Sequence, residues 1–272
     1  MLGVHTNYAS IVAQGAVNKS NNLLTNAMER LSTGLRINSA SDDAAGLQIA
    51  NRMSANVKGM ETASRNISDA TSMLQTADGA LEELTTIANR QKELATQASN
   101  GVNSTADLKA LDDEFKQLNA EITRIVENTT YAGNNLFKDA TDGVLVKGVT
   151  FQIGSDGAEQ MSVTLGAIDK TVTGDLLTSA AANTAIGAVD TFLAKVGTER
   201  STLGANINRL GHTAANLASV TENTKAAAGR IMDADFAVES ANMTRNQLLV
   251  QAGTTVLSSA NQNTGLVMGL LR

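Results

Sequence analysis

The chain contains 272 residues with a formal net charge of −6 at pH 7, and it has no proline, no cysteine and no tryptophan. Without cysteine there is neither a disulfide framework nor thiolate chemistry, and an acidic balance offers no electrostatic footprint for nucleic acid. The two histidines lie far apart in the chain, and no apolar run approaches the roughly 20 residues of a membrane span. We therefore expect no catalytic, cofactor-binding or metal-binding residues, no cofactor and no membrane insertion.

The absence of proline permits long unbroken helices, because proline breaks helix interiors. Aromatic residues make up only 3% of the chain. This favours a slim bundle packed through Leu, Ile, Val and Ala over the thick core of a compact enzyme. The first residues show no basic region followed by an apolar stretch, so a cleaved secretory signal peptide is not expected.

Residues 3–35 predict an amphipathic helix, which Gly34 is expected to end. Its apolar face contains Val17, Leu24, Met28, Leu31 and Leu35. Many of the remaining residues are Asn and Ser, which are weak helix formers, so we expect this helix to fold only when it is packed. Ser41 is expected to cap the next helix, with Asp42 and Asp43 in its first turn.

A long heptad run predicts one helix over residues 47–99. Its seam alternates by three and four residues, and large side chains alternate with alanine, which allows helices to approach closely. The seam positions are Met60, Ala63, Ile67, Ala70, Leu74, Ala77, Leu81, Leu84, Ala88, Gln91 and Ala95. Asn100 and Gly101 should end this helix, and Ser104 should open the next with a capping box. The predicted seam of that next helix is Leu108, Leu111, Phe115, Leu118, Ile122 and Ile125. The short link predicts an antiparallel helical hairpin.

The middle of the chain changes to an alternation with period two. Val149, Phe151 and Ile153 define one strand, and a second strand follows a turn at residues 154–158. The inward positions of the second strand are Met161, Val163 and Leu165. This pattern predicts a β-hairpin, the one convincing β signal of the sequence.

The last third of the chain carries the longest seam, which predicts one very long helix over residues 186–270. The spacing of three and four residues is typical of helices that supercoil around partners. The first half, Ile186 to Leu217, is rich in large aliphatic residues and should pack within the chain. The second half is built of small and polar residues, on a seam through Val238, Asn242, Arg245, Leu249, Ala252 and Val256 and on a sister seam from Leu249 to Leu270. We expect this half to pack against other chains rather than within its own chain.

Catalytic motifs are absent: there is no Walker loop, no G-x-G-x-x-G after a strand, no H-E-x-x-H and no nucleophile elbow. The acidic cluster at residues 112–114 is interpreted as a solvated helix face. The residues alone therefore favour a helical interaction or assembly protein.

Both ends of the chain are specific enough to indicate a family. Residues 28–50 (MERLSTGLRINSASDDAAGLQIA) and 230–272 (from RIMDADFA through QAGTTVL to LLR) closely resemble the terminal signatures of bacterial flagellins. Two places differ from the usual flagellin pattern. Ser41 stands where many flagellins have Lys, and Asn-Thr-Gly at residues 263–265 stands where Val-Pro-Gln is usual. Because the middle is short, the chain resembles a lateral-type flagellin that lacks large outer domains.

The resemblance implies a mainly α fold: an elongated antiparallel bundle of long helices with a small β-hairpin, whose terminal helices form a coiled coil in the filament. It divides the chain into an N-terminal inner-tube helix and spoke (1–42), two halves of a helical outer-tube domain (43–140 and 179–235), a short variable region (141–178) and a C-terminal inner-tube helix (236–272). The implied function is that of the structural subunit of the flagellar filament, the motility propeller.

The resemblance also implies partners. Copies of the chain form a helical homopolymer outside the cell, after type III export without a cleaved signal peptide. The other implied partners are the export chaperone, the filament cap, the hook-associated proteins and a host Toll-like receptor, whose patch matches Arg90, Leu94 and Glu114, with Gln97 nearby. The expected assembly seam consists of Leu24, Met28, Leu31, Leu35, Leu249, Val256, Val267 and Leu270.

Three alternatives remain at this stage. A hook–filament junction protein has the same layout, although the terminal Leu-Leu-Arg favours flagellin. An enzyme or polysaccharide-binding module lacks a catalytic cluster, and the small hairpin leaves little room for a pocket. The signalling coiled coil of a chemoreceptor would need a membrane segment, which the sequence does not contain.

Overall fold

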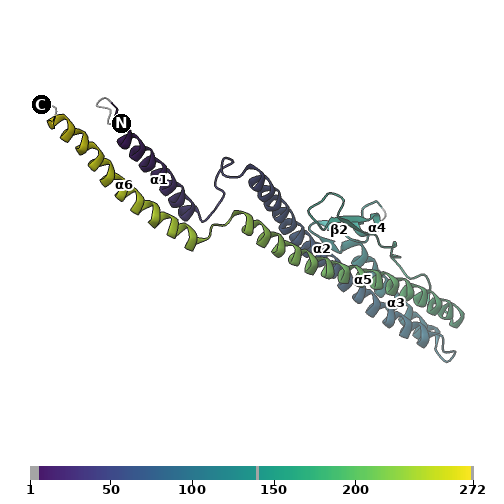
Figure 1. Ribbon diagram of the computed structural model, residues 1–272. Helices are drawn as coiled ribbons and strands as arrows, with labels where there is room; N and C mark the ends of the chain where they lie inside the picture. Colours follow the sequence, from purple (N-terminus) through teal and green to yellow (C-terminus); the bar gives the residue numbers. More distant parts are fainter. Residues whose placement is uncertain (1–5, 139–140, 271–272) are drawn as a thin grey trace. The chain divides into compact units, whose positions relative to one another are not determined.

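The computed structural model describes residues 6–138 and 141–270, with side chains as far as residue 262. The elements are α1 (Tyr8–Thr33), α2 (Ala44–Ala98), α3 (Thr105–Asn128), β1 (Thr130–Tyr131), β2 (Asn134–Asn135), α4 (Val144–Lys147), β3 (Val149–Gln152), β4 (Gln160–Val163), α5 (Ser179–Met232) and α6 (Phe236–Leu270) (Figure 1). Two compact units result. The first comprises residues 1–55 and 223–272, and the second comprises residues 56–222.

The second unit is held together by the predicted seams. Every position of the α2 seam from Met60 to Ala95 is buried. On α3, Phe115 and Ile122 are fully buried, and the other predicted seam residues pack against the same core. The first half of the α5 seam is also buried, at Val189, Val196, Leu203, Leu210 and Leu217. The heptad analysis is therefore confirmed for all three long helices.

The turns of the second unit also follow the sequence. Ser104 caps α3 with the predicted box, in which its hydroxyl accepts from the amide of Asp107 while the Asp107 carboxylate accepts from the amide of Ser104. The β-hairpin forms with Phe151 opposite Met161. The sequence analysis missed a second, two-residue hairpin, β1–β2, whose turn places Ala132 and Gly133 at positive φ.

Three expectations are wrong in detail. The very long helix is interrupted at residues 233–235, so α5 ends at Met232 and α6 begins at Phe236. The cap of α2 is Asp43 rather than Ser41, because the amide of Gly46 donates to the Asp43 carboxylate at 2.8 Å. Asp112 does not lie on a solvated face. It is 1% exposed and accepts a hydrogen bond from the amide of Leu176 at 3.0 Å.

Candidate functional site

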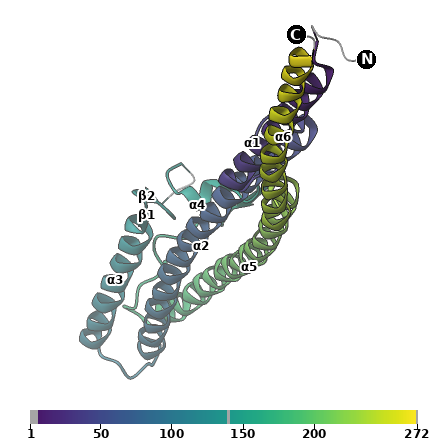
Figure 2. The same cartoon turned by 60° about the vertical axis from the view of Figure 1, so that its left-hand side comes forward.

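The first unit is dominated by α1 and α6, which lie side by side in both views (Figures 1 and 2). Their direction is antiparallel, because the side-chain Nδ2 of Asn7 donates to the carbonyl of Ala260 at 2.9 Å while Arg30 pairs with Glu239 at 3.1 Å. α1 begins under the cap of Asn7 and ends at Gly34, which adopts the left-handed conformation, as predicted for a glycine stop.

The two helices meet along seams with a spacing of three and four residues. Every member of both seams is buried or half-buried. On α1 they are Ser10, Ala13, Val17, Ser20, Leu24, Ala27 and Leu31, and on α6 they are Glu239, Met243, Asn246, Val250, Gly253, Leu257 and Ala260. The contact is close at Gly253, where an added Cβ would lie 2.6 Å from a methyl group of Val17. The observed α6 seam is thus displaced by one residue from the predicted seam through Leu249 and Val256, although it shares Gly253 and Ala260 with the predicted sister seam.

Large apolar side chains remain exposed on this pair. Of the fourteen exposed large hydrophobic residues among the described side chains, ten belong to α1 and α6. They are Tyr8, Ile11, Val12, Leu23, Met28, Phe236, Val238, Leu248, Leu249 and Val256. Their surroundings carry little charge, since Lys19 is the only charged residue in 8–28 and Arg245 the only one in 241–262. We call these ten side chains the apolar surface of the helix pair.

The expected assembly residues fall into three groups. Leu24, Leu31 and Leu35 are half-buried within the first unit. Met28, Leu249 and Val256 are exposed and belong to the apolar surface, so in the single chain they do not pack against the partner helix. The side chains of the last two, Val267 and Leu270, lie outside the described residues.

The expected receptor patch lies in the second unit, where α2 faces α3. Arg90 donates through Nε and Nη2 to one carboxylate oxygen of Glu114, at 3.0 and 2.9 Å, and through Nη1 to Glu93 at 3.0 Å. The hydrogen bond to Glu114, followed by that to Glu93, raises the pKa of Arg90 above its ordinary value. Leu94 is 1% exposed, so its side chain supports the patch from beneath and contributes nothing to the surface.

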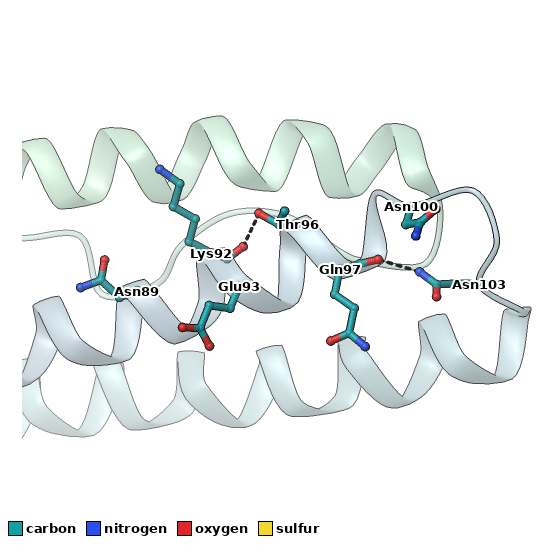
Figure 3. A pocket seen from close by; sticks show the side chains of 7 residues that line it. All are labelled: Asn89, Lys92, Glu93, Thr96, Gln97, Asn100 and Asn103. Carbon is teal, nitrogen blue, oxygen red and sulfur yellow. Dashed lines mark hydrogen bonds between the residues drawn. The ribbon is translucent and has the colours of Figure 1, made fainter.

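A polar hollow lies beside this patch at the end of α2 (Figure 3). It is lined by Asn89, Lys92, Glu93, Thr96, Gln97, Asn100 and Asn103. Glu93 and Gln97 project from the same side of α2, while Lys92 extends to Asp190 at 2.6 Å. Gln97 lies on the same helix as the exposed Arg90, about two turns further along.

Among the described residues, no group of three His, Cys, Asp or Glu side chains could hold a metal ion. Likewise, no helix within that part of the chain combines the length and apolar character needed to cross a membrane. The prominent features are therefore contact surfaces: an apolar, charge-poor pair of terminal helices and a charged patch on a helical hairpin. The fold and these surfaces define a helical structural protein.

The comparisons with known proteins identify the family. The model of the bacterial flagellin N-terminal helical region matches residues 4–142, and that of the C-terminal helical region matches residues 186–271. The chain therefore belongs to the bacterial flagellins and is a structural subunit of the flagellar filament. A hook–filament junction protein is not favoured.

Individual relatives agree with this assignment. A flagellin of Halalkalibacterium halodurans is 43% identical over 252 residues, which cover 90% of this chain and 91% of that protein. The flagellar filament 33 kDa core protein of Treponema phagedenis is 34% identical, with 99% of both chains covered. The crystal structure of Bacillus cereus flagellin is similar with a TM-score of 0.51 and 34% identity, over 56% of this chain and 88% of that one.

Proposed function

We propose that copies of this chain polymerise through the apolar surface of the α1–α6 pair, and that this polymer drives motility as a rotating filament. The observation that carries the proposal is the concentration of ten exposed large hydrophobic side chains on two charge-poor helices. The gathering of so many exposed apolar side chains on one pair of helices favours an interaction surface over single surface residues. A surface with so few charges is best covered by an equally uncharged one, and a second copy of the same chain offers it.

In the proposed filament, residues 1–42 and 236–272 form the inner tube, and residues 43–140 and 179–235 form the outer tube. Residues 141–178, with the β-hairpin, then face outward. The burial of the α2, α3 and α5 seams within one unit supports the outer-tube role, since that unit holds its own core. The exposed residues of α1 and α6 support the inner-tube role, because they lack cover in the single chain.

Electron microscopy of the purified, seeded full-length protein tests this proposal. Filaments of uniform width are expected. A chain that stays monomeric at high concentration, with or without seeds, contradicts polymerisation through this surface.

The further partners in this proposal are an export chaperone, the filament cap and hook-associated proteins. The chaperone would cover α6 before export through the type III apparatus without a cleaved signal peptide, because α6 exposes Leu248, Leu249 and Val256. Its binding is tested by co-purification with the full chain and with a chain lacking residues 240–272. Equal recovery with both chains contradicts a site on α6.

A host Toll-like receptor is the last proposed partner. Its contact would be the exposed pair of Arg90 and Glu114 together with Gln97. Their placement on the outer side of the α2–α3 hairpin supports this assignment, whereas the buried Leu94 would act only by shaping the helix surface.

A further inference from the structure

The α1–α6 seam sets large side chains against small or polar ones. Val17 faces Gly253, and counting along both helices from this contact sets Leu24 against Asn246. If the two helices shift by seven residues, Val17 faces Ala260 and Leu24 faces Gly253. Large still faces small after this shift, so the shape of the seam alone does not select one register.

Backbone contacts at the end of the pair favour the observed register. The amide of Ala234 donates to the carbonyl of Gly34 at 2.9 Å, and the amide of Arg36 donates to the carbonyl of Met232 at 2.6 Å. These groups are available because Gly34, Arg36 and Ala234 lie outside the helices and Met232 is the last residue of α5. A shift by seven residues would set them against helix interiors, whose backbone groups are already paired.

The ion pair between Arg30 and Glu239 distinguishes the registers. Glu239 stands on the seam with its side chain 10% exposed, and Arg30 reaches it from the flank of α1 at 3.1 Å. Asn246 occupies the equivalent seam position one heptad later and is also buried. A seven-residue shift would bring Arg30 to Asn246, which offers no charge, and would leave the Glu239 carboxylate buried without a cation. Loss of one partner from a buried charge pair is strongly destabilising.

We propose that Arg30 and Glu239 are the side chains that select the register in which α1 pairs with α6 within one chain. A single polar group on a coiled-coil seam is known to specify register at some cost in stability. The role concerns which residues of α1 and α6 face each other inside one subunit, and it applies wherever the pair is folded, in the free chain or in a polymer.

Because the chain has no cysteine, pairs of introduced cysteines can report the register. The variant Val17→Cys/Gly253→Cys reports the observed register, and Val17→Cys/Ala260→Cys and Val17→Cys/Asn246→Cys report shifts by one heptad in either direction. Each pair is made in the full-length chain alone and combined with Arg30→Glu, with Glu239→Arg, and with both reversals. Lys19→Glu, an exposed charge reversal on the same helix, is the control.

Oxidation should yield an intrachain disulfide for the Val17/Gly253 pair in the parent and in the Lys19→Glu control. Either single reversal should lower the ratio of the Val17/Gly253 disulfide to the disulfides of the shifted pairs about tenfold. A change of this size is within the range of coupling between contacting residues. The double reversal should restore the ratio. An unchanged ratio after single reversal, no restoration by the double reversal, or a disulfide only between chains would overturn the proposal. Sedimentation of the same samples measures polymerisation, so that a loss of polymerisation can be told apart from a change of register.

Discussion

Replacing Leu249 and Val256 together by Ala should weaken polymerisation and leave the second unit folded. The two side chains lie one heptad apart on α6 and are 49% and 58% exposed. Full burial of such a side chain contributes about 1.5–3 kcal/mol, so covering the exposed half of each yields about 1 kcal/mol. The pair should therefore contribute about 2 kcal/mol per subunit, which corresponds to a roughly 30-fold higher critical concentration. Alanine also has a higher helix propensity than either residue, so a weakened helix would not explain the loss.

The critical concentration can be measured by sedimentation of seeded full-length protein over a concentration series. A matched control removes the same two side-chain types from exposed positions of the second unit, as Val102→Ala/Leu177→Ala. These residues are 83% and 47% exposed. A control that raises the critical concentration as much as the α6 variant, or an α6 variant that polymerises like the parent, would refute the assignment of the apolar surface.

Deletion of residues 240–272 should leave a folded, soluble monomer, since the second unit keeps its whole core; filaments seen by electron microscopy would contradict this. Gln91→Leu should raise the free energy of unfolding by about 1 kcal/mol, because its buried side-chain oxygen accepts no hydrogen bond among the described residues; a lower melting temperature would argue against it. The double substitution of Arg90 and Glu114 by Ala should weaken receptor signalling in a reporter-cell assay without changing the critical concentration, and unaltered signalling would exclude the patch. Asp107→Ala should lower the melting temperature at neutral pH. The hydrogen bonds from Ser104 hold the pKa of Asp107 below its ordinary 3.8, so its contribution is present above that value and should vanish as the pH falls through the lowered pKa; a pH-independent difference would contradict this.

The sequence predicted the second unit well because its seams are chemically unambiguous. From Met60 to Ala95, each seam position of α2 is apolar except Gln91, and most of the flanking positions are polar, with Met73, Ala80, Ile87 and Leu94 as the exceptions, so one face is marked for burial. The capping box at Ser104 was equally predictable, because an acidic residue stands three positions later.

The first unit was harder to predict because apolar character does not mark its buried face. A search for large side chains on α6 selects Leu249 and Val256, yet the helix buries Glu239, Asn246 and Gly253 against α1. A one-residue displacement results. The only signal for the observed seam was the three-and-four spacing of Val250, Gly253, Leu257 and Ala260, in which large and small residues alternate and allow close approach at Gly253.

The cap of α2 and the burial of Leu94 on that helix were not predictable from the sequence, for related reasons. Ser41 and Asp43 are both good N-cap residues, and only the folded loop decides that Asp43 receives the amide of Gly46. Leu94 follows exposed neighbours in the sequence, but its place beside the seam residue Ala95 buries it. Local propensity does not decide which residue caps a helix or whether a side chain beside the seam is buried, because both depend on tertiary packing.

The composition of the α1–α6 pair explains why polymerisation and folding of these helices should be coupled. Their mutual seam buries mainly small and polar side chains, so pairing alone removes little apolar surface from water, while isolated helices rich in Asn and Ser are marginal. Ten further large apolar side chains remain exposed on the pair and would be covered only by association. A partner that binds the folded pair and not the unfolded chain stabilises it by mass action. We therefore expect the order of these helices to depend on the concentration of the other subunits, and we expect the second unit, with its own buried Leu and Ala seams, to stay folded on dilution.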